Sequence, residues 1–168
     1  MSTITLPVGY GLVVLCNVVL PAFYMQWAGF RAGGSRKRTG VALPAMQAFA
    51  GMPALTNKRQ PVVDEKTGKP YLVTEDQALE FNCAQRTHYN ALETLGDFRL
   101  MSLVAGFLNP YVTAAFGVVW TVSRYSWALG YDAKGGRYSR SKNLGGFHWL
   151  ALIGVCLMSI YQGAAWSG

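Results

Sequence analysis

Charged residues are scarce in this sequence: they make up 14% of its 168 residues, whereas soluble domains carry about 25%. The shortage favours a chain with much of its surface in lipid. The Lys and Arg residues do not follow one helix or alternate with exposed aromatic residues, but lie in two blocks between long apolar runs. The net charge of +7 therefore indicates a membrane surface rather than a nucleic-acid partner.

Residues that form disulfides or bind metals are also few. The cysteines, Cys16, Cys83 and Cys156, include no CxxC pair, and two of them lie within apolar runs. This pattern argues against a disulfide framework or a zinc site and indicates small buried side chains. The two histidines, His88 and His148, are too few for a His-based metal centre and are interpreted as packing or interface residues. We therefore predict no metal cofactor.

Long apolar runs are what the sequence has in abundance. Residues 8–30 contain no charged side chain. As a helix rising about 1.5 Å per residue, this run spans roughly 34 Å, enough to cross a hydrocarbon core of about 30 Å. A signal peptide needs a basic start, but no Lys or Arg precedes Arg31. The run is therefore interpreted as a retained membrane helix, in which Pro21 should produce a kink.

Three further helices follow. The second has a polar first half and an apolar second half, so only its distal part is expected at lipid depth. Asn109 and Pro110 predict an uncharged tight turn before the third helix. The fold class is therefore predicted to be all-α: an integral membrane four-helix bundle that forms a single domain over residues 1–168. The predicted helices cover residues 8–30, 75–108, 111–131 and 146–166.

The charges of the loops orient these helices. Lys and Arg are concentrated in the first loop, residues 31–74, and in residues 132–145 after the third helix, while both termini carry none. The positive-inside rule places both basic loops in the cytosol and both termini on the opposite side. Within the first loop, residues 43–55 are apolar and are expected either to lie at the membrane interface or to pack over the domain. The endoplasmic reticulum is the expected membrane, with a mitochondrial membrane as the alternative.

One face of the second helix is polar. Its members recur at positions i, i+4, i+7 and i+11 and fall within roughly 60° of one another at about 100° per residue. A membrane helix tolerates ionised groups only where they face protein or a wet cavity, so this stripe should face another helix or another subunit. Two interpretations stay open: the stripe joins the bundle through polar contacts, or it binds a ligand. The stripe consists of Arg86, Asn90, Glu93 and Asp97.

Further arginines are expected near this stripe. Arg124 lies near the cytosolic end of the third helix, and Arg137 and Arg140 lie in the basic loop that follows. Arginine binds carboxylates through two parallel hydrogen bonds, so the group suits a small anionic ligand. The sequence offers no nucleophile–base pair and no Gly-rich phosphate loop. The reactive chemistry would therefore have to come from the ligand itself.

The segment from Phe81 to Glu93, FNCAQRTHYNALE, matches every fixed position of a known motif, FNxxQRxHxNxxE. This motif is typical of the type-3 microsomal glutathione transferases, so the sequence resembles the MAPEG superfamily. The end of the third helix resembles the RxxYxxGY block of the same proteins, with tryptophan in place of the first tyrosine. The matching residues of this block are Arg124, Trp127, Gly130 and Tyr131.

The resemblance implies a homotrimer that holds one glutathione at each subunit interface, in a cleft open to the cytosol. An arginine after the third helix activates the thiol in these proteins; Arg140 is the first candidate here and Arg137 the second. A nearby guanidinium favours the thiolate of a thiol whose pKa is ordinarily about 8.5. The thiolate would attack a lipophilic electrophile or reduce a lipid hydroperoxide that arrives from the membrane lipid. The implied glutathione contacts are Arg36, Gln85, Arg86, Asn90, Glu93, Arg124 and Tyr131.

Two functions are consistent with this sequence. The first is a membrane-bound glutathione transferase and peroxidase. The second is a non-catalytic protein of the same fold that serves as an accessory subunit of a larger membrane complex. The second is favoured by a first loop longer than in relatives, by Trp127 in place of tyrosine, and by the charged residues Asp97 and Arg99 in the second helix.

Overall fold

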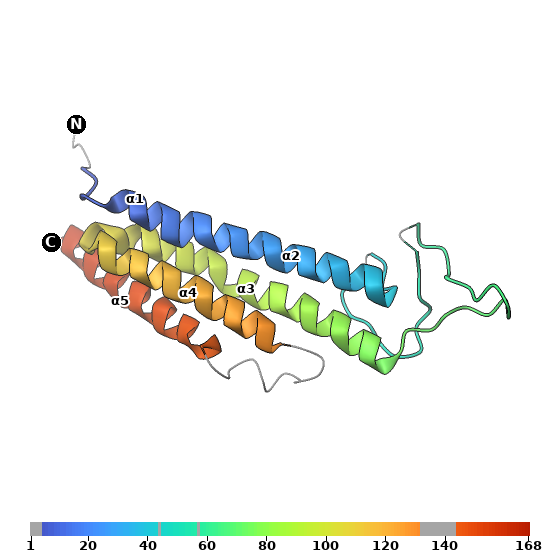
Figure 1. Ribbon diagram of the computed structural model, residues 1–168. Helices are drawn as coiled ribbons and strands as arrows, with labels where there is room; N and C mark the ends of the chain where they lie inside the picture. Colours follow the sequence, from blue (N-terminus) through green and yellow to red (C-terminus); the bar gives the residue numbers. More distant parts are fainter. Residues whose placement is uncertain (1–4, 44, 57, 132–143) are drawn as a thin grey trace.

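The computed structural model describes residues 5–43, 45–56, 58–131 and 144–168. Long helices lie side by side along one axis, with the start of α1 and the end of α5 at the same end of the bundle (Figure 1). Over the described residues the fold is all-α, as predicted, and extended backbone occurs only as isolated bridges. The elements are α1 (Tyr10–Val13), a π-helical segment (Val14–Val19), α2 (Leu20–Thr39), α3 (Glu75–Leu108), α4 (Pro110–Gly130), a 3₁₀ turn (Gly145–Phe147) and α5 (His148–Ser167).

The first helix ends at Thr39, so the predicted end at residue 30 is wrong. The segment RAGGSRKRT continues the helix because Arg and Lys are good helix formers. Cations in the last turn also interact favourably with the negative C-terminal end of the helix dipole. Gly40 ends the helix with φ 71°, a conformation that favours glycine. A Cβ atom at Gly40 would lie 2.8 Å from the Cβ of Ala54. The first loop therefore begins at Gly40 rather than at residue 31.

Pro21 is preceded by the π-helical segment Val14–Val19. Pro21 has no N–H to donate to the carbonyl of Asn17, and π-helical turns occur where the regular bonding of a helix is interrupted. Asn17 is fully buried, and its Nδ2 donates to the Oγ of Ser102 and to the carbonyl of Thr113, both at 3.0 Å. The irregular turn thus places a buried amide where it joins the first helix to α3 and α4.

α3 and α4 begin and end where the sequence predicted within a residue. Thr74 accepts from the backbone of Gln77 and the Gln77 side chain accepts from Thr74, which is a capping box. At the other end, the Asn109 side chain accepts two backbone N–H groups at the start of α4, which explains the tight turn. The 34 residues of α3 span about 51 Å, longer than a hydrocarbon core of about 30 Å.

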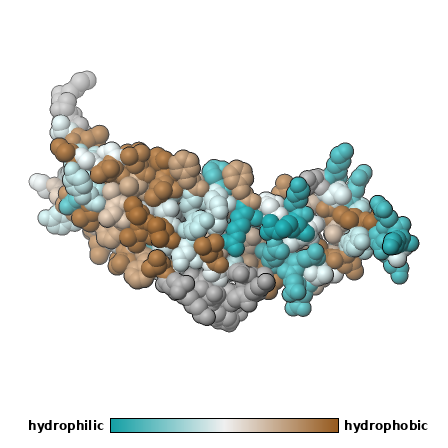
Figure 2. All heavy atoms as spheres, viewed as in Figure 1, coloured by the Kyte–Doolittle hydropathy of each residue, from teal (hydrophilic) through white to brown (hydrophobic). Residues whose placement is uncertain are grey.

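Among the described residues, two helical segments are long and apolar enough to cross a membrane by themselves. They are Tyr10–Thr39 and Gly145–Ser167, each with a mean hydropathy of 1.5. Hydrophobic surface gathers over the end of the bundle that holds the termini, and hydrophilic surface gathers at the opposite end, around the long loop (Figure 2). The polar first half of α3 therefore projects beyond the apolar part of the bundle, as its sequence predicted.

The loop between α2 and α3 folds into a small packed unit, here called the loop module (the described residues of 40–74). Three strand-like segments are joined by backbone hydrogen bonds: Ala54 N–H to Tyr71, Val62 N–H to Ala54 and Tyr71 N–H to Val62, at 2.8, 2.9 and 2.8 Å. Ala48 and Ala54, within the apolar segment 43–55, are buried against α3, which fits the second of the two arrangements considered for this segment. The buried core of the module and of α3 beneath it contains Val41, Ala48, Ala54, Val73, Ala78 and Phe81.

The tip of the loop module is a turn around Asp64. The carboxylate accepts the backbone N–H of Lys66 at 2.9 Å and the hydroxyl of Thr67 at 3.0 Å. These hydrogen bonds, the first of them foremost, hold the pKa of Asp64 below its ordinary value. Gly68 follows with φ 66°. These contacts close a tight turn within the segment DEKTGKP.

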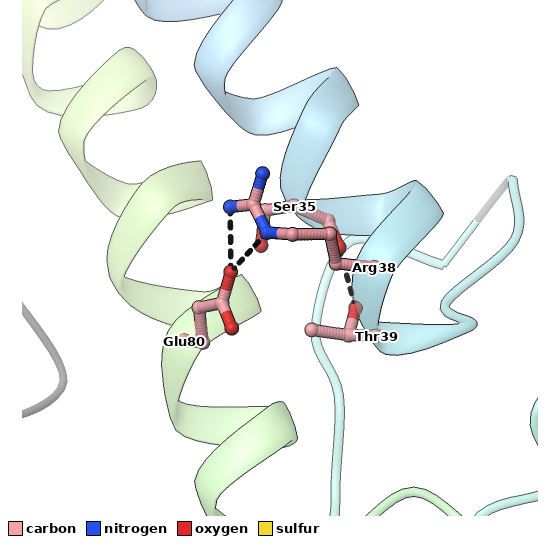
Figure 3. Close-up of polar contacts among 4 residues, drawn as sticks. All are labelled: Ser35, Arg38, Thr39 and Glu80. Atoms are coloured by element: carbon pink, nitrogen blue, oxygen red, sulfur yellow. Dashed lines mark hydrogen bonds and ion pairs between the residues drawn. The ribbon is translucent and has the colours of Figure 1, made fainter.

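Polar contacts join the loop module to α3, and α2 to α3, at this end of the bundle. The Oδ1 of Asn82 accepts the N–H of Ala48 and its Nδ2 donates to the Ala48 carbonyl, both at 2.8 Å. Arg38 on α2 pairs with Glu80 on α3 at 2.6 Å, and Thr39 donates to the Ser35 carbonyl at 2.8 Å (Figure 3). The Arg38–Glu80 pair is exposed, and exposed ion pairs contribute little to stability.

We expect Asn82→Ala to loosen the loop module. The substitution leaves both backbone groups of Ala48 unpaired, which costs about 2 kcal/mol locally. Amide hydrogen exchange at Gly51 and Val73, whose N–H groups donate within the module, should then accelerate by roughly tenfold or more. Arg38→Ala, at the same end of the bundle, is the control and should change exchange far less. Equal acceleration in both variants would contradict the role given to Asn82.

Candidate functional site

A cavity of about 240 Å³ opens between the middle of α3, the end of α4 and the start of α5. Each helix contributes part of the wall because α3 contacts both α4 and α5 along its length. Three of the four residues of the polar stripe line it, together with Arg124. The full lining is Arg86, Asn90, Glu93, Thr94, Arg124, Trp127, His148 and Trp149.

Arg124 is the most buried cation of this cavity, with 2% of its surface exposed. Its Nη2 donates to the Thr94 hydroxyl at 2.5 Å, and its guanidinium lies 5.4 Å from the centre of the Trp120 ring. Its Nε has no hydrogen-bond partner among the described residues. No carboxylate in the described part of the chain forms an ion pair with it. A buried cation without an anion is costly, so this guanidinium is suited to a ligand carboxylate.

Arg86 and Glu93 stand at the open side of the cavity. Their side chains are 60% and 59% exposed, and Nη1 of Arg86 lies 4.0 Å from Oε1 of Glu93. The two groups thus pair only loosely along the stripe. Because both groups keep most of their surface exposed, the guanidinium and the carboxylate are available to a charged ligand or to another subunit.

The α4 and α5 side of the cavity is aromatic. Trp127 meets the ring of His148 edge to face, with centroids 5.0 Å apart and an interplanar angle of 86°. Trp149 lies 5.0 Å from the same imidazole. Nδ1 of His148 donates to the Gly145 carbonyl oxygen, 2.7 Å away. The cavity therefore has a charged wall on α3, a buried cation on α4 and an aromatic wall next to it.

Not all of the predicted contacts meet at this cavity. Gln85 and Tyr131 are buried, 8% and 7% exposed, but are not among the residues that line it. Arg36 lies in the last turn of α2. Its guanidinium is 4.7 Å from the centre of the Phe81 ring and donates to the Ala45 carbonyl of the loop module at 2.7 Å. The predicted thiol-activating residues, Arg137 and Arg140, lie outside the described residues.

A smaller cavity of about 200 Å³ surrounds the base of the loop module. It includes Arg36, Lys37 and Thr56, and its other lining residues are apolar or glycine. Within the described part of the chain, no three His, Cys, Asp or Glu side chains are grouped closely enough to hold a metal ion. The larger cavity is therefore the best candidate for a binding site, and its chemistry is that of cations and one carboxylate facing a zwitterionic or anionic molecule.

The sequence was also compared with models of protein families. The model described as MAPEG family matches residues 13–161, which is most of the chain. The chain belongs to the MAPEG family. This family includes glutathione transferases and related membrane proteins. The match spans every helix that contributes to the cavity, so the polar stripe and Arg124 lie within the matched region.

Four residues of the MAPEG cavity were not predicted as ligand contacts: Thr94, Trp127, His148 and Trp149. Thr94 follows Glu93 by one position, and its hydroxyl is the partner of Arg124. Trp127 stood out in the sequence only as a replacement for tyrosine. His148 and Trp149 belong to a separate apolar run, and no local pattern indicates that the start of this run meets the middle of α3.

Proposed function

We propose that this MAPEG protein is a membrane-bound glutathione transferase and peroxidase. It joins the glutathione thiolate to lipophilic electrophiles or uses it to reduce lipid hydroperoxides. The observation that carries the proposal is the cavity that unites Arg86, Asn90, Glu93 and Arg124. Glutathione has two carboxylates and one ammonium group, and this wall offers two guanidinium groups and one carboxylate in return.

The proposed roles follow from the chemistry of each side chain. Arg124, buried and without an anionic partner among the described residues, binds one carboxylate. Arg86 binds the other carboxylate at the open side, and Glu93 binds the ammonium group. Asn90 lies between Arg86 and Glu93 in the stripe, and its amide forms hydrogen bonds with the polar groups of glutathione. The family resemblance adds Arg36, Gln85 and Tyr131 as further proposed contacts. These three lie away from the cavity within one subunit, so any contact they make would come from another subunit.

The exposed stripe on α3 supports a homotrimer as part of this proposal. Arg86 and Glu93 keep about 60% of their side chains exposed, and exposed charges on a membrane protein of this kind need protein or water around them. A neighbouring subunit would close the open side of the cavity over bound glutathione. We place the protein in the endoplasmic reticulum membrane, or alternatively in a mitochondrial membrane, with the loop module in the cytosol.

The thiol-activating cation is proposed to be Arg140, with Arg137 as the second candidate. A guanidinium a few ångströms from the sulfur favours the thiolate, and each unit of pKa lowering corresponds to about 1.4 kcal/mol. In conjugation the thiolate sulfur bonds to the electrophilic carbon, and the electron pair of the bond that breaks there departs with a leaving group or moves to an activating carbonyl, which takes up a proton. Alternatively, the thiolate attacks the terminal hydroperoxide oxygen and the O–O bond breaks. The lipid alkoxide takes up a proton and leaves as the alcohol, and glutathione sulfenic acid remains. In the peroxidase reaction a second glutathione completes the disulfide and supplies the remaining reducing equivalent.

Purified protein in detergent, assayed with glutathione and a lipid hydroperoxide, tests the proposal. We expect turnover by the wild type and a fall of about 100-fold in kcat for the Arg137→Ala/Arg140→Ala double variant, as is typical when a stabilising group for a reacting anion is removed. The control is the Lys134→Ala/Lys142→Ala double variant, which removes the same charge from the same loop. No turnover by the wild type above that of the arginine variant would contradict the proposed activity.

The loop module favours one alternative: a non-catalytic accessory subunit of a larger membrane complex. Leu43, Met46 and Phe49 on the module are 63%, 52% and 66% exposed, at the end of the bundle where the surface is mainly hydrophilic (Figure 2). Such side chains suit a partner protein. Gentle solubilisation followed by sizing separates the two: a monomer in a stoichiometric larger complex supports the alternative, and a free trimer supports the enzyme.

A further inference from the structure

One polar side chain on the cavity wall has no part in the proposed binding of the glutathione carboxylates and ammonium group. His148 is 1% exposed, and its Nδ1 lies 2.7 Å from the Gly145 carbonyl oxygen. A carbonyl can only accept, so Nδ1 carries a proton and donates to it. In the neutral ring Nε2 is then an acceptor. It is buried and has no hydrogen-bond partner among the described residues.

The imidazole is held in place on several sides. The backbone N–H of His148 donates to the Ser123 hydroxyl at 2.7 Å, and that hydroxyl donates to the Leu144 carbonyl at 2.7 Å. The rings of Trp127 and Trp149 also contact the imidazole, with centroids 5.0 Å away in each case. The ring cannot turn without breaking these contacts. The position of the free lone pair at Nε2 is therefore fixed before any ligand binds.

The polarity of the cavity indicates which ligand group belongs there. The charged groups, Arg86, Glu93 and Arg124, suit the carboxylates and the ammonium group of the ligand. The wall around His148 is aromatic and offers a neutral hydrogen-bond acceptor at Nε2. A ligand carboxylate does not fit there, because its oxygen and Nε2 are both acceptors. The ligand group that fits this wall is a weakly polar donor with an apolar body, and the thiol of glutathione has that character.

We propose that Nε2 of His148 accepts a hydrogen bond from the thiol of bound glutathione and so positions the sulfur at the aromatic end of the cavity. This inference rests on the proposed function. A buried acceptor without a donor is unfavourable, and the S–H group removes that penalty when it binds. Trp149 at this end is 49% exposed on the outer surface of α5, so the sulfur would face the side from which a lipid-soluble substrate arrives.

Calorimetric titration of the full chain in detergent micelles with glutathione and with S-methylglutathione tests this inference. S-methylglutathione keeps the carboxylates and the ammonium group but has no S–H donor. His148→Asn retains a donor for the Gly145 carbonyl and removes the acceptor at the Nε2 position. We expect it to weaken glutathione binding by about three- to tenfold and to leave the affinity for S-methylglutathione unchanged.

His148→Gln places a carbonyl oxygen near the Nε2 position and is expected to restore most of the glutathione affinity. Because both ligands are measured on each variant, general damage to the fold would weaken both and overturn the inference, as would unchanged glutathione binding in His148→Asn. Failure of His148→Gln to restore affinity would also overturn it. A wild type that binds neither ligand contradicts the proposed function itself, so the two failures are distinguishable.

Discussion

Replacement of Arg124 by methionine is expected to remove measurable glutathione binding and to leave the protein at least as stable as the wild type. The guanidinium is 2% exposed and forms no ion pair with a described residue. In the free protein it is a buried charge that contacts the Thr94 hydroxyl and the Trp120 ring. Methionine fills a similar volume without the desolvation cost of a buried charge, so the free energy of unfolding should be equal or higher.

The loss of binding should be large because the ligand carboxylate would then be buried without its cation. Removal of one partner of a buried charge pair costs about 2–5 kcal/mol, or roughly 30-fold to more than 1,000-fold in Kd. Calorimetric titration and thermal unfolding of the same sample measure both quantities. Arg124→Lys is expected to recover only part of the affinity, because an ammonium group cannot form two parallel bonds to a carboxylate.

Arg99→Met is the matched control for Arg124→Met. Arg99 is also a partly buried arginine of the bundle, and its Nη2 donates to the Val18 carbonyl at 3.0 Å, away from the cavity. We expect this variant to lose about 1–2 kcal/mol of stability and to bind glutathione normally. An Arg124→Met protein that binds glutathione as tightly as the wild type, or that is much less stable than Arg99→Met, would mean that Arg124 serves the fold.

A second large effect is expected at Gly117, where α4 packs directly on the backbone of the first helix. A Cβ atom at Gly117 would lie 2.5 Å from the Cys16 carbonyl oxygen and 2.6 Å from Oδ1 of Asn17. Backbone cannot move aside as a flexible side chain can, so Gly117→Ala must separate the two helices. This separation would also lengthen the hydrogen bonds of Asn17 to Ser102 and Thr113.

We expect Gly117→Ala to lower the free energy of unfolding by about 3 kcal/mol, the sum of overpacking and of weakened buried hydrogen bonds. Thermal unfolding in detergent, followed by tryptophan fluorescence, measures the effect. Gly33→Ala is the control: Gly33 is an exposed helical residue with nothing within 4 Å of its added Cβ. There the change should stabilise by about 0.5–1 kcal/mol through helix propensity alone. Similar results for both variants would contradict the close approach at Gly117.

Local signals explain which parts of the fold the sequence predicted well. α3 agrees with its predicted range, 75–108, because its ends are set locally: Thr74 caps its start, and Asn109 followed by Pro110 interrupts the chain at its end. The first helix was predicted too short because glycines and cations resemble a loop when only composition is considered. Its true end depends on Gly40, which lies against Ala54, a contact with a residue of the loop module that no local pattern reveals.

For the cavity too, residues placed by local sequence patterns could be predicted, whereas residues placed by tertiary contacts could not. Arg86, Asn90 and Glu93 share one helix, so a period of 3.6 residues suffices to place them together. Arg124 was added by its expected depth in the membrane. His148 comes from a run that meets α3 only through tertiary packing, and its role depends on a hydrogen bond to Gly145 that sequence cannot show. The loop module depends in the same way on backbone bonds between segments far apart in the chain.

The turn between α3 and α4 has a consequence for biogenesis. Asn109 satisfies two backbone N–H groups of α4 with its own side chain, at 3.2 and 3.1 Å, and Pro110 has no N–H to satisfy. A turn that carries no charge and few unpaired donors is inexpensive to transfer through hydrocarbon. α3 and α4 therefore suit co-translational insertion as one helical hairpin, whose uncharged tip crosses the bilayer first.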